Sequence, residues 1–150
     1  MKKTFGRWVK DTPSVVLAGF SMGAAEVARI AESDPKTYRR IVIGDSAHDP
    51  RPTFRFSRAW ASGGGERAMF LCTTSGCEPS MRAAAKRVTT QKTEASARLV
   101  VAPTQKHELS DRAARSMRID WGWLVEGAEG WEAYKAPAEP SSATRTESFE

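Results

Sequence analysis

The stretch VVLAGFSMG, residues 15–23, decides the fold of this 150-residue chain. It begins with a continuous apolar run, which indicates a strand covered on both faces, as in a parallel sheet between layers of helices. The segment that follows, residues 24–32, is rich in Ala, Glu and Arg and has helical spacing. The sequence therefore predicts a strand, a sharp turn at Ser21 and a helix.

The same strand-and-helix unit recurs along the chain. Three further short apolar runs predict strands at 41–44, 69–72 and 99–102. Helices are predicted over 79–89, and from a cap at Ser110 to about Val125. Strands that alternate with helices form a parallel sheet with right-handed crossovers. We therefore predict an α/β fold of three layers, with a mostly parallel sheet of about four strands.

The remaining segments lack such regular patterns. Residues 2–11 predict a short helix, and residues 44–65 a polar, proline-containing loop followed by an irregular stretch. Residues 136–150 have no periodicity and are rich in Pro, Ser, Thr and Glu, which is typical of a disordered tail. The predicted organisation is one domain over 1–135 and a disordered tail over 136–150.

Composition excludes several classes of function. The net charge of +5 would suit a polyanion, but Lys and Arg are scattered without a basic run, so we expect no nucleic-acid partner. No apolar run is long enough for a membrane span, and the basic start has no apolar region behind it, so we expect a cytoplasmic protein. Cys72 and Cys77 are too few for a disulfide scaffold and lack the companions of a zinc site. They are expected to be a buried strand residue and a loop thiol.

Gly19, Ser21 and Gly23 form a G-x-S-x-G pattern between a predicted strand and a predicted helix, the context that this nucleophile motif requires. A serine can project from so sharp a turn only where the chain before and after it passes close by, so side chains at the two glycines are expected to collide. The backbone N–H of Met22 would then stabilise an oxyanion. The alternative is a glycine-rich turn with an incidental serine, or a phosphate-binding loop, although no Walker sequence follows.

A nucleophilic serine needs a histidine base and an acid that orients it. His107 follows the fourth predicted strand, at the sheet edge where Ser21 is expected, whereas His48 precedes any later acid. Glu78, after the third strand, is the first candidate for the acid, and Asp45, after the second strand, is the alternative. Both carboxylates could equally be turn residues that accept backbone hydrogen bonds.

From residue 15 to residue 131 the sequence resembles the C-terminal half of the α/β-hydrolase family, through the Gly19 to Gly23 turn, the further strand-and-helix units and His107. The resemblance implies a serine hydrolase that forms an acyl-enzyme at Ser21 from a small-molecule ester, thioester or amide. It implies no metal and no organic cofactor.

The family's earlier strands, and the loop that gives the second oxyanion donor, have no counterpart in this sequence. The strand before Ser21 would then lie at an edge of the sheet, which favours self-association through that edge. We therefore expect a truncated form, or a protomer that needs a partner to complete its sheet. The alternative function is a catalytically inactive remnant that serves as a binding or assembly module.

Overall fold

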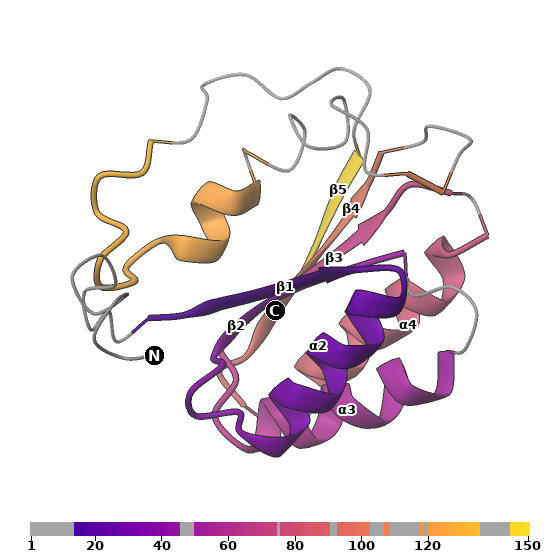
Figure 1. Cartoon of the computed structure of the whole chain (residues 1–150), viewed down its shortest axis with the longest axis horizontal. Helices are drawn as coiled ribbons and strands as arrows, with labels where there is room; N and C mark the ends of the chain where they lie inside the picture. The colour runs from indigo at the N-terminus through magenta and orange to yellow at the C-terminus, as the bar shows by residue number, and fades with distance from the viewer. Residues whose placement is uncertain are drawn as a thin grey trace, which may run out of the picture.

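The computed structural model describes residues 14–45, 50–74, 76–90, 93–102, 107–108, 118, 120–135 and 145–150. These residues form a five-stranded sheet whose strands follow the order of the sequence. The strands are β1 (Val16–Phe20), β2 (Arg40–Gly44), β3 (Arg67–Cys72), β4 (Ser96–Val101) and β5 (Arg145–Phe149). Strands β1 to β4 are parallel and β5 is antiparallel to β4 (Figure 1). The predicted α/β fold with a mostly parallel sheet is confirmed.

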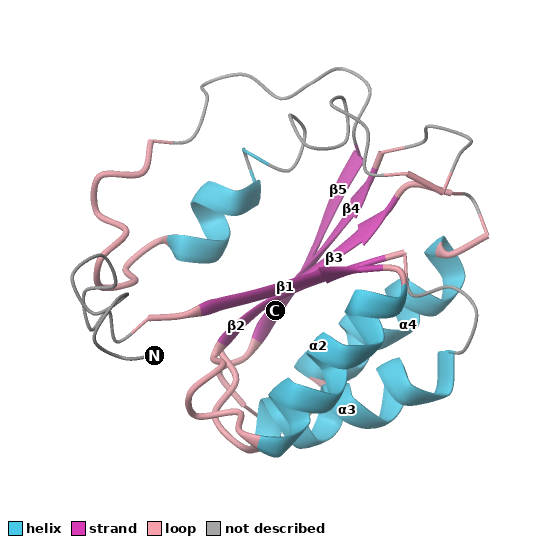
Figure 2. Cartoon of the chain, in the orientation of Figure 1, coloured by secondary structure: helices cyan, strands magenta, loops and turns pink. Residues whose placement is uncertain are grey.

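Helices cover both faces of this sheet (Figure 2). Helices α2 (Met22–Ser33), α3 (Pro50–Ser62) and α4 (Glu78–Thr89) lie on one face, and the helical residues 120–125 lie on the other. Strand β2 is buried along its whole length, as its continuous apolar sequence predicts. Ile41 and Ile43 join the core under α2 to α4, whereas Val42 packs in a second core with Leu124.

Helix α3 corrects the prediction of an irregular stretch before residue 63. Its prolines, Pro50 and Pro52, lie in the first turn, where a missing backbone N–H costs nothing. Phe56 and Trp60 are spaced one helical turn apart, and both are buried in the core. The indole N–H of Trp60 also donates to the carbonyl of Tyr38 at 2.7 Å. Burial of two large aromatic side chains therefore outweighs the loop-like composition.

Strand β5 corrects the prediction that 136–150 is a disordered tail, at least for residues 145–149; residues 136–144 lie outside the described residues. Phe149 packs against the core beneath α4. Arg145 pairs with Glu78 of α4, and Glu147 pairs with Arg82 of the same helix. The polar composition of this segment hides these specific partners, which belong to a helix more than sixty residues earlier in the chain.

Strand β1 lies at one edge of the sheet formed by the described residues, as the sequence predicts. Its register pairs Phe20 with Gly44, and Gly44 in turn pairs with Leu71. The carboxyl ends of three neighbouring strands therefore meet at one edge of the sheet.

The helix predicted over 2–11 and the cap predicted at Ser110 both lie outside the described residues. Within the described part of the chain, no helix has the length and apolar character needed to cross a lipid bilayer.

Candidate active site

Ser21 occupies a strained turn between β1 and α2. Its backbone has φ 55° and ψ −122°, a left-handed conformation that a residue other than glycine rarely adopts. Two backbone hydrogen bonds hold the turn: Ser21 N–H donates to the carbonyl of Gly44 at 2.8 Å, and Ala24 N–H donates to the carbonyl of Ser21 at 3.0 Å. The sheet and the helix therefore hold the serine in a conformation that projects its hydroxyl from the end of β1.

The two glycines of the motif do not play equal parts. A Cβ added to Gly19 would collide with the backbone carbonyl of Gly23 and would lie 2.7 Å from Cγ2 of Val27. A Cβ added to Gly23 would meet no atom within 4 Å among the described residues. The expected collision at both glycines is therefore wrong for Gly23. Only Gly19 is required by the close approach of α2 to the end of β1.

This asymmetry gives a matched pair of variants. Gly19→Ala is expected to lower the free energy of unfolding by about 3 kcal/mol or more, because its methyl group meets backbone that cannot move aside. Gly23→Ala is expected to leave that free energy unchanged or to raise it by up to about 1 kcal/mol, because alanine favours the helix. Urea unfolding of both variants measures the difference. Equal losses in the two variants would contradict the steric argument.

His107 is placed between Ser21 and Asp45. Its Nε2 lies 2.7 Å from Ser21 Oγ, and its Nδ1 lies 3.1 Å from Asp45 Oδ2. The neutral tautomer that carries its proton on Nδ1 satisfies both contacts, since Nδ1–H then donates to the carboxylate and Nε2 accepts from the serine hydroxyl. The ring of Phe20 stacks on the imidazole, with centroids 5.1 Å apart and 28° between the planes. The structure thus brings together the predicted nucleophile, base and alternative acid.

Asp45 is held firmly at the end of β2. Its carboxylate is fully buried, and its backbone has a positive φ of 44°. The Asp45 N–H donates to the carbonyl of Leu71 at 2.9 Å. Thr73 donates two hydrogen bonds to the carboxylate: its N–H donates to Oδ1 at 2.7 Å, and its hydroxyl donates to Oδ2. These donors compensate the burial of the charge and aim Oδ2 at His107.

Glu78, the first candidate for the acid, has different partners. It lies in the first turn of α4, where its carboxylate accepts hydrogen bonds from Arg82 at 2.6 Å and from Arg145 of β5. The hydrogen bond from Arg82 holds the pKa of this carboxyl below its usual value; burial opposes that effect, and the charge and hydrogen bond of Arg145 add to it. The prediction of Glu78 as the acid beside His107 is therefore corrected: the structure brings Asp45 to His107, and ties Glu78 to the α4–β5 contact.

Met22 begins α2 directly after Ser21. The first backbone N–H groups of a helix have no carbonyl within their own helix to receive them, and the helix dipole favours negative charge at that end. Met22 is 85% exposed, so its side chain points away from the core. The Met22 N–H is thus positioned as the oxyanion donor that the sequence predicts, and that role stays a prediction. His48, the other candidate base, lies outside the described residues.

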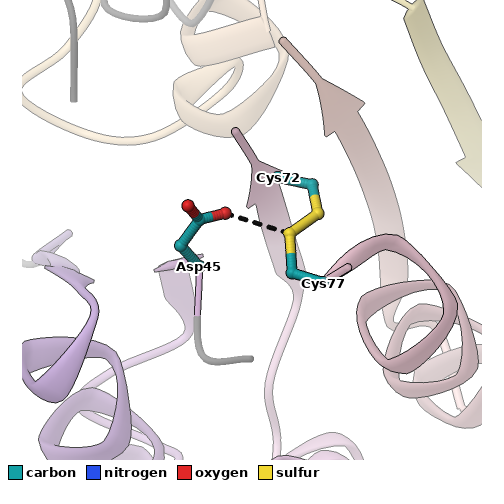
Figure 3. Close-up of side chains that lie close together, drawn as sticks. All are labelled: Asp45, Cys72 and Cys77. Atoms are coloured by element: carbon teal, nitrogen blue, oxygen red, sulfur yellow. Dashed lines mark hydrogen bonds between the residues drawn. A yellow bond between two sulfur atoms is a disulfide. The ribbon is translucent and has the colours of Figure 1, made fainter. Parts of the chain in front are cut away.

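Cys72 and Cys77 form a disulfide beside Asp45 (Figure 3). Cys72 is buried in β3 as expected, but Cys77 is a fully buried residue at the start of α4 and not a loop thiol. The tight turn between β3 and α4 brings their Cα atoms to 6.0 Å, a usual separation for a disulfide. A spacing of five residues across a predicted strand-to-helix turn was the signal in the sequence that could have indicated this pair.

The same three residues are the metal-ligating cluster found among the described residues: Asp45, Cys72 and Cys77 bring their ligand atoms within 4.8 Å of one another. A metal would need free thiolates, and here the two sulfurs are bonded to each other. The oxygens of Asp45 are engaged by Thr73 and His107. In this oxidised form the cluster therefore does not offer an open set of ligands.

A cavity of about 690 Å³ lies beside the helix at 120–125, lined in part by Trp123, Trp131 and Tyr134. None of the residues that line it is Ser21, Asp45 or His107. The candidate active site is therefore located by the hydrogen bonds among Ser21, His107 and Asp45 at the end of β1, and not by this cavity.

No family model matches this chain, and no curated protein matches it significantly. The solved structure described as "Crystal Structure of pOPH Native" is similar to it, with a TM-score of 0.61 and 14% sequence identity. The similarity covers 96% of this chain and 55% of that one, so this chain spans about half the length of its structural neighbour. At such low identity the likeness shows the α/β fold alone.

Proposed function

We propose that this chain carries the nucleophile, base and acid of a serine hydrolase with an α/β-hydrolase type of fold. The observation that carries the proposal is one line of hydrogen bonds, from Ser21 Oγ through both ring nitrogens of His107 to Asp45 Oδ2. Such a line on a glycine-rich turn between a buried strand and a helix is the arrangement that activates a serine for acyl transfer. The strained backbone at Ser21 adds to this support, because strain of this kind is concentrated at functional sites.

In the proposed reaction, Ser21 Oγ attacks the carbonyl carbon of an ester, thioester or amide while His107 Nε2 takes the hydroxyl proton. The Met22 N–H donates to the oxygen that becomes negative. The tetrahedral intermediate then collapses, and the leaving group departs with the proton from His107. Water attacks the acyl-enzyme and gives its proton to His107, which returns it to Ser21. Asp45 orients the imidazole and stabilises its charged form.

A fluorophosphonate probe tests this proposal. We expect one probe molecule per folded chain, and mass spectrometry of peptides should find it on Ser21, since only an activated serine attacks such a probe at neutral pH. Heat-denatured protein is the control and should stay unlabelled, because the contact of His107 with Ser21 exists only in the folded chain. Folded protein that takes up no probe, or takes it up at another residue, would overturn the proposal and favour a binding module instead.

A further inference from the structure

The two cysteines of the Cys72–Cys77 disulfide lie on either side of Thr73 in the sequence, and Thr73 is the residue that binds the carboxylate of Asp45. Thr73 follows Cys72 directly, and both of its hydrogen-bond donors are committed to the carboxylate of Asp45. The disulfide ties the end of β3, just before Thr73, to Cys77, the N-cap residue of α4. The carbonyl of Thr74 also receives the Cys77 N–H at 3.3 Å, so the turn is closed by a covalent bond and by a hydrogen bond.

The disulfide also touches the carboxylate directly. Sγ of Cys77 lies 3.0 Å from Oδ1 of Asp45, the oxygen that Thr73 N–H binds (Figure 3). Both cysteines are fully buried, as is Thr73. The sulfur therefore packs against Oδ1, the carboxylate oxygen that His107 does not contact, and leaves the carboxylate less room to move.

From this geometry we propose that the Cys72–Cys77 disulfide is a positioning element of the acid, so that reduction of the disulfide lowers turnover. This inference rests on the proposed function. The cross-link fixes the turn that carries Thr73, and Thr73 fixes Asp45 so that Oδ2 faces Nδ1 of His107. When the disulfide is reduced, the turn that carries Thr73 can adopt more conformations, and the carboxylate of Asp45 is no longer held in one position.

Reduction requires a dithiol reductant. One of its thiolates attacks a sulfur of the disulfide, and the mixed disulfide that results releases the other cysteine as a thiolate, which takes up a proton. The second thiol of the reductant then displaces the remaining cysteine. Two cysteine thiols and one oxidised reductant are the products. Because both sulfurs are buried, this exchange waits for opening of the turn, so a small dithiol is the suitable reagent.

The experiment measures kcat and KM on a chromogenic ester for the oxidised chain, for the chain reduced by a small dithiol, and for Cys72→Ala and Cys77→Ala. Rates are expressed per active site titrated with the fluorophosphonate probe, so that loss of folded protein does not count as loss of turnover. We expect kcat to fall on the order of tenfold in the reduced chain and in both variants, with little change in KM. Both variants should be insensitive to the dithiol, and reoxidation of the wild-type chain should restore its kcat.

A double-mutant cycle tests the route through Thr73. Thr73→Val should lower kcat and Thr73→Ser, which keeps the hydroxyl donor, should restore most of it. In the Thr73→Val background, Cys72→Ala should lower kcat much less than it does in the wild-type chain, because the hydroxyl hydrogen bond from Thr73 to Asp45 is already lost. Fully additive losses in this cycle would contradict positioning through Thr73.

The outcomes separate this inference from the proposed function. A chain whose Ser21 takes up no probe in either redox form fails as a hydrolase. A chain that is labelled in both forms, and whose kcat per titrated site differs by less than twofold after verified reduction, remains a hydrolase, and the disulfide then has no positioning role.

Discussion

Replacing Ser21 by alanine is expected to lower kcat on a chromogenic ester on the order of 10⁶-fold, to the rate left by binding and oxyanion stabilisation alone. The physical reason is that the reaction then lacks the atom that forms the covalent bond with the acyl group, while His107 and Asp45 stay in place. The measurement is steady-state hydrolysis by wild-type chain and variant at equal folded concentration, verified by circular dichroism.

Ser33→Ala is the matched control. Ser33 ends the same helix, is exposed, and donates its hydroxyl to the carbonyl of Ile30 at 2.7 Å. Its replacement is expected to leave kcat at the wild-type value. Equal activity in the Ser21 variant and the wild-type chain would show that any hydrolysis observed comes from another group or from a contaminant.

The second large effect is expected at Asp45. Asp45→Asn replaces the carboxylate that accepts from His107 Nδ1 by an amide. An amide N–H that donates to Nδ1 favours the imidazole tautomer whose proton is on Nε2. That nitrogen can then no longer accept the proton of Ser21, so kcat is expected to fall about 10⁴-fold. Turnover per titrated active site measures it, because the variant is still labelled, although slowly.

Glu78→Gln is the control for this second prediction, since it alters the other candidate acid. We expect kcat to stay within about twofold of the wild-type value, and the free energy of unfolding to fall by about 0.5–1 kcal/mol, as for a partly exposed ion pair. Arg82 keeps the pKa of Glu78 low in the folded chain, so this stability is present at neutral pH and is lost as the pH falls through that lowered pKa. Urea unfolding at neutral and acidic pH checks this. A large loss of kcat in the Glu78 variant with little loss in the Asp45 variant would reverse the assignment.

The parts of the fold that the sequence predicts well are those with strong local patterns. The apolar run before Ser21 predicts β1, and the similar runs predict β2 to β4, because a strand buried on both faces must be apolar throughout. Chain order directs the base to His107, since a loop after the last parallel strand returns to the edge that holds Ser21. These predictions depend on interactions between residues close in sequence, or on the regular topology of parallel sheets.

The parts that it misses depend on contacts between distant segments. The choice between Asp45, at the end of β2, and Glu78, in the first turn of α4, depends on which carboxylate faces His107. Glu78 pairs instead with Arg145, which comes from a segment of polar composition. Strand β5 itself is recognisable only from its pairing with β4 and its ion pairs with α4. No local pattern of composition encodes such partners.

The order of the strands has a consequence for how the site comes into being. Each of the strands β1 to β4 pairs with its neighbour in sequence, so the sheet can grow by one strand at a time, each strand joined to the one before it by a single helical crossover. The hydrogen bond between Ser21 and His107 instead joins residues 86 positions apart. A chain that has assembled only its first three strands holds Ser21 on its turn and Asp45 nearby, but lacks the base. Under the proposed function, a sheet that grew in this order would give Ser21 its base only after β4 had joined it.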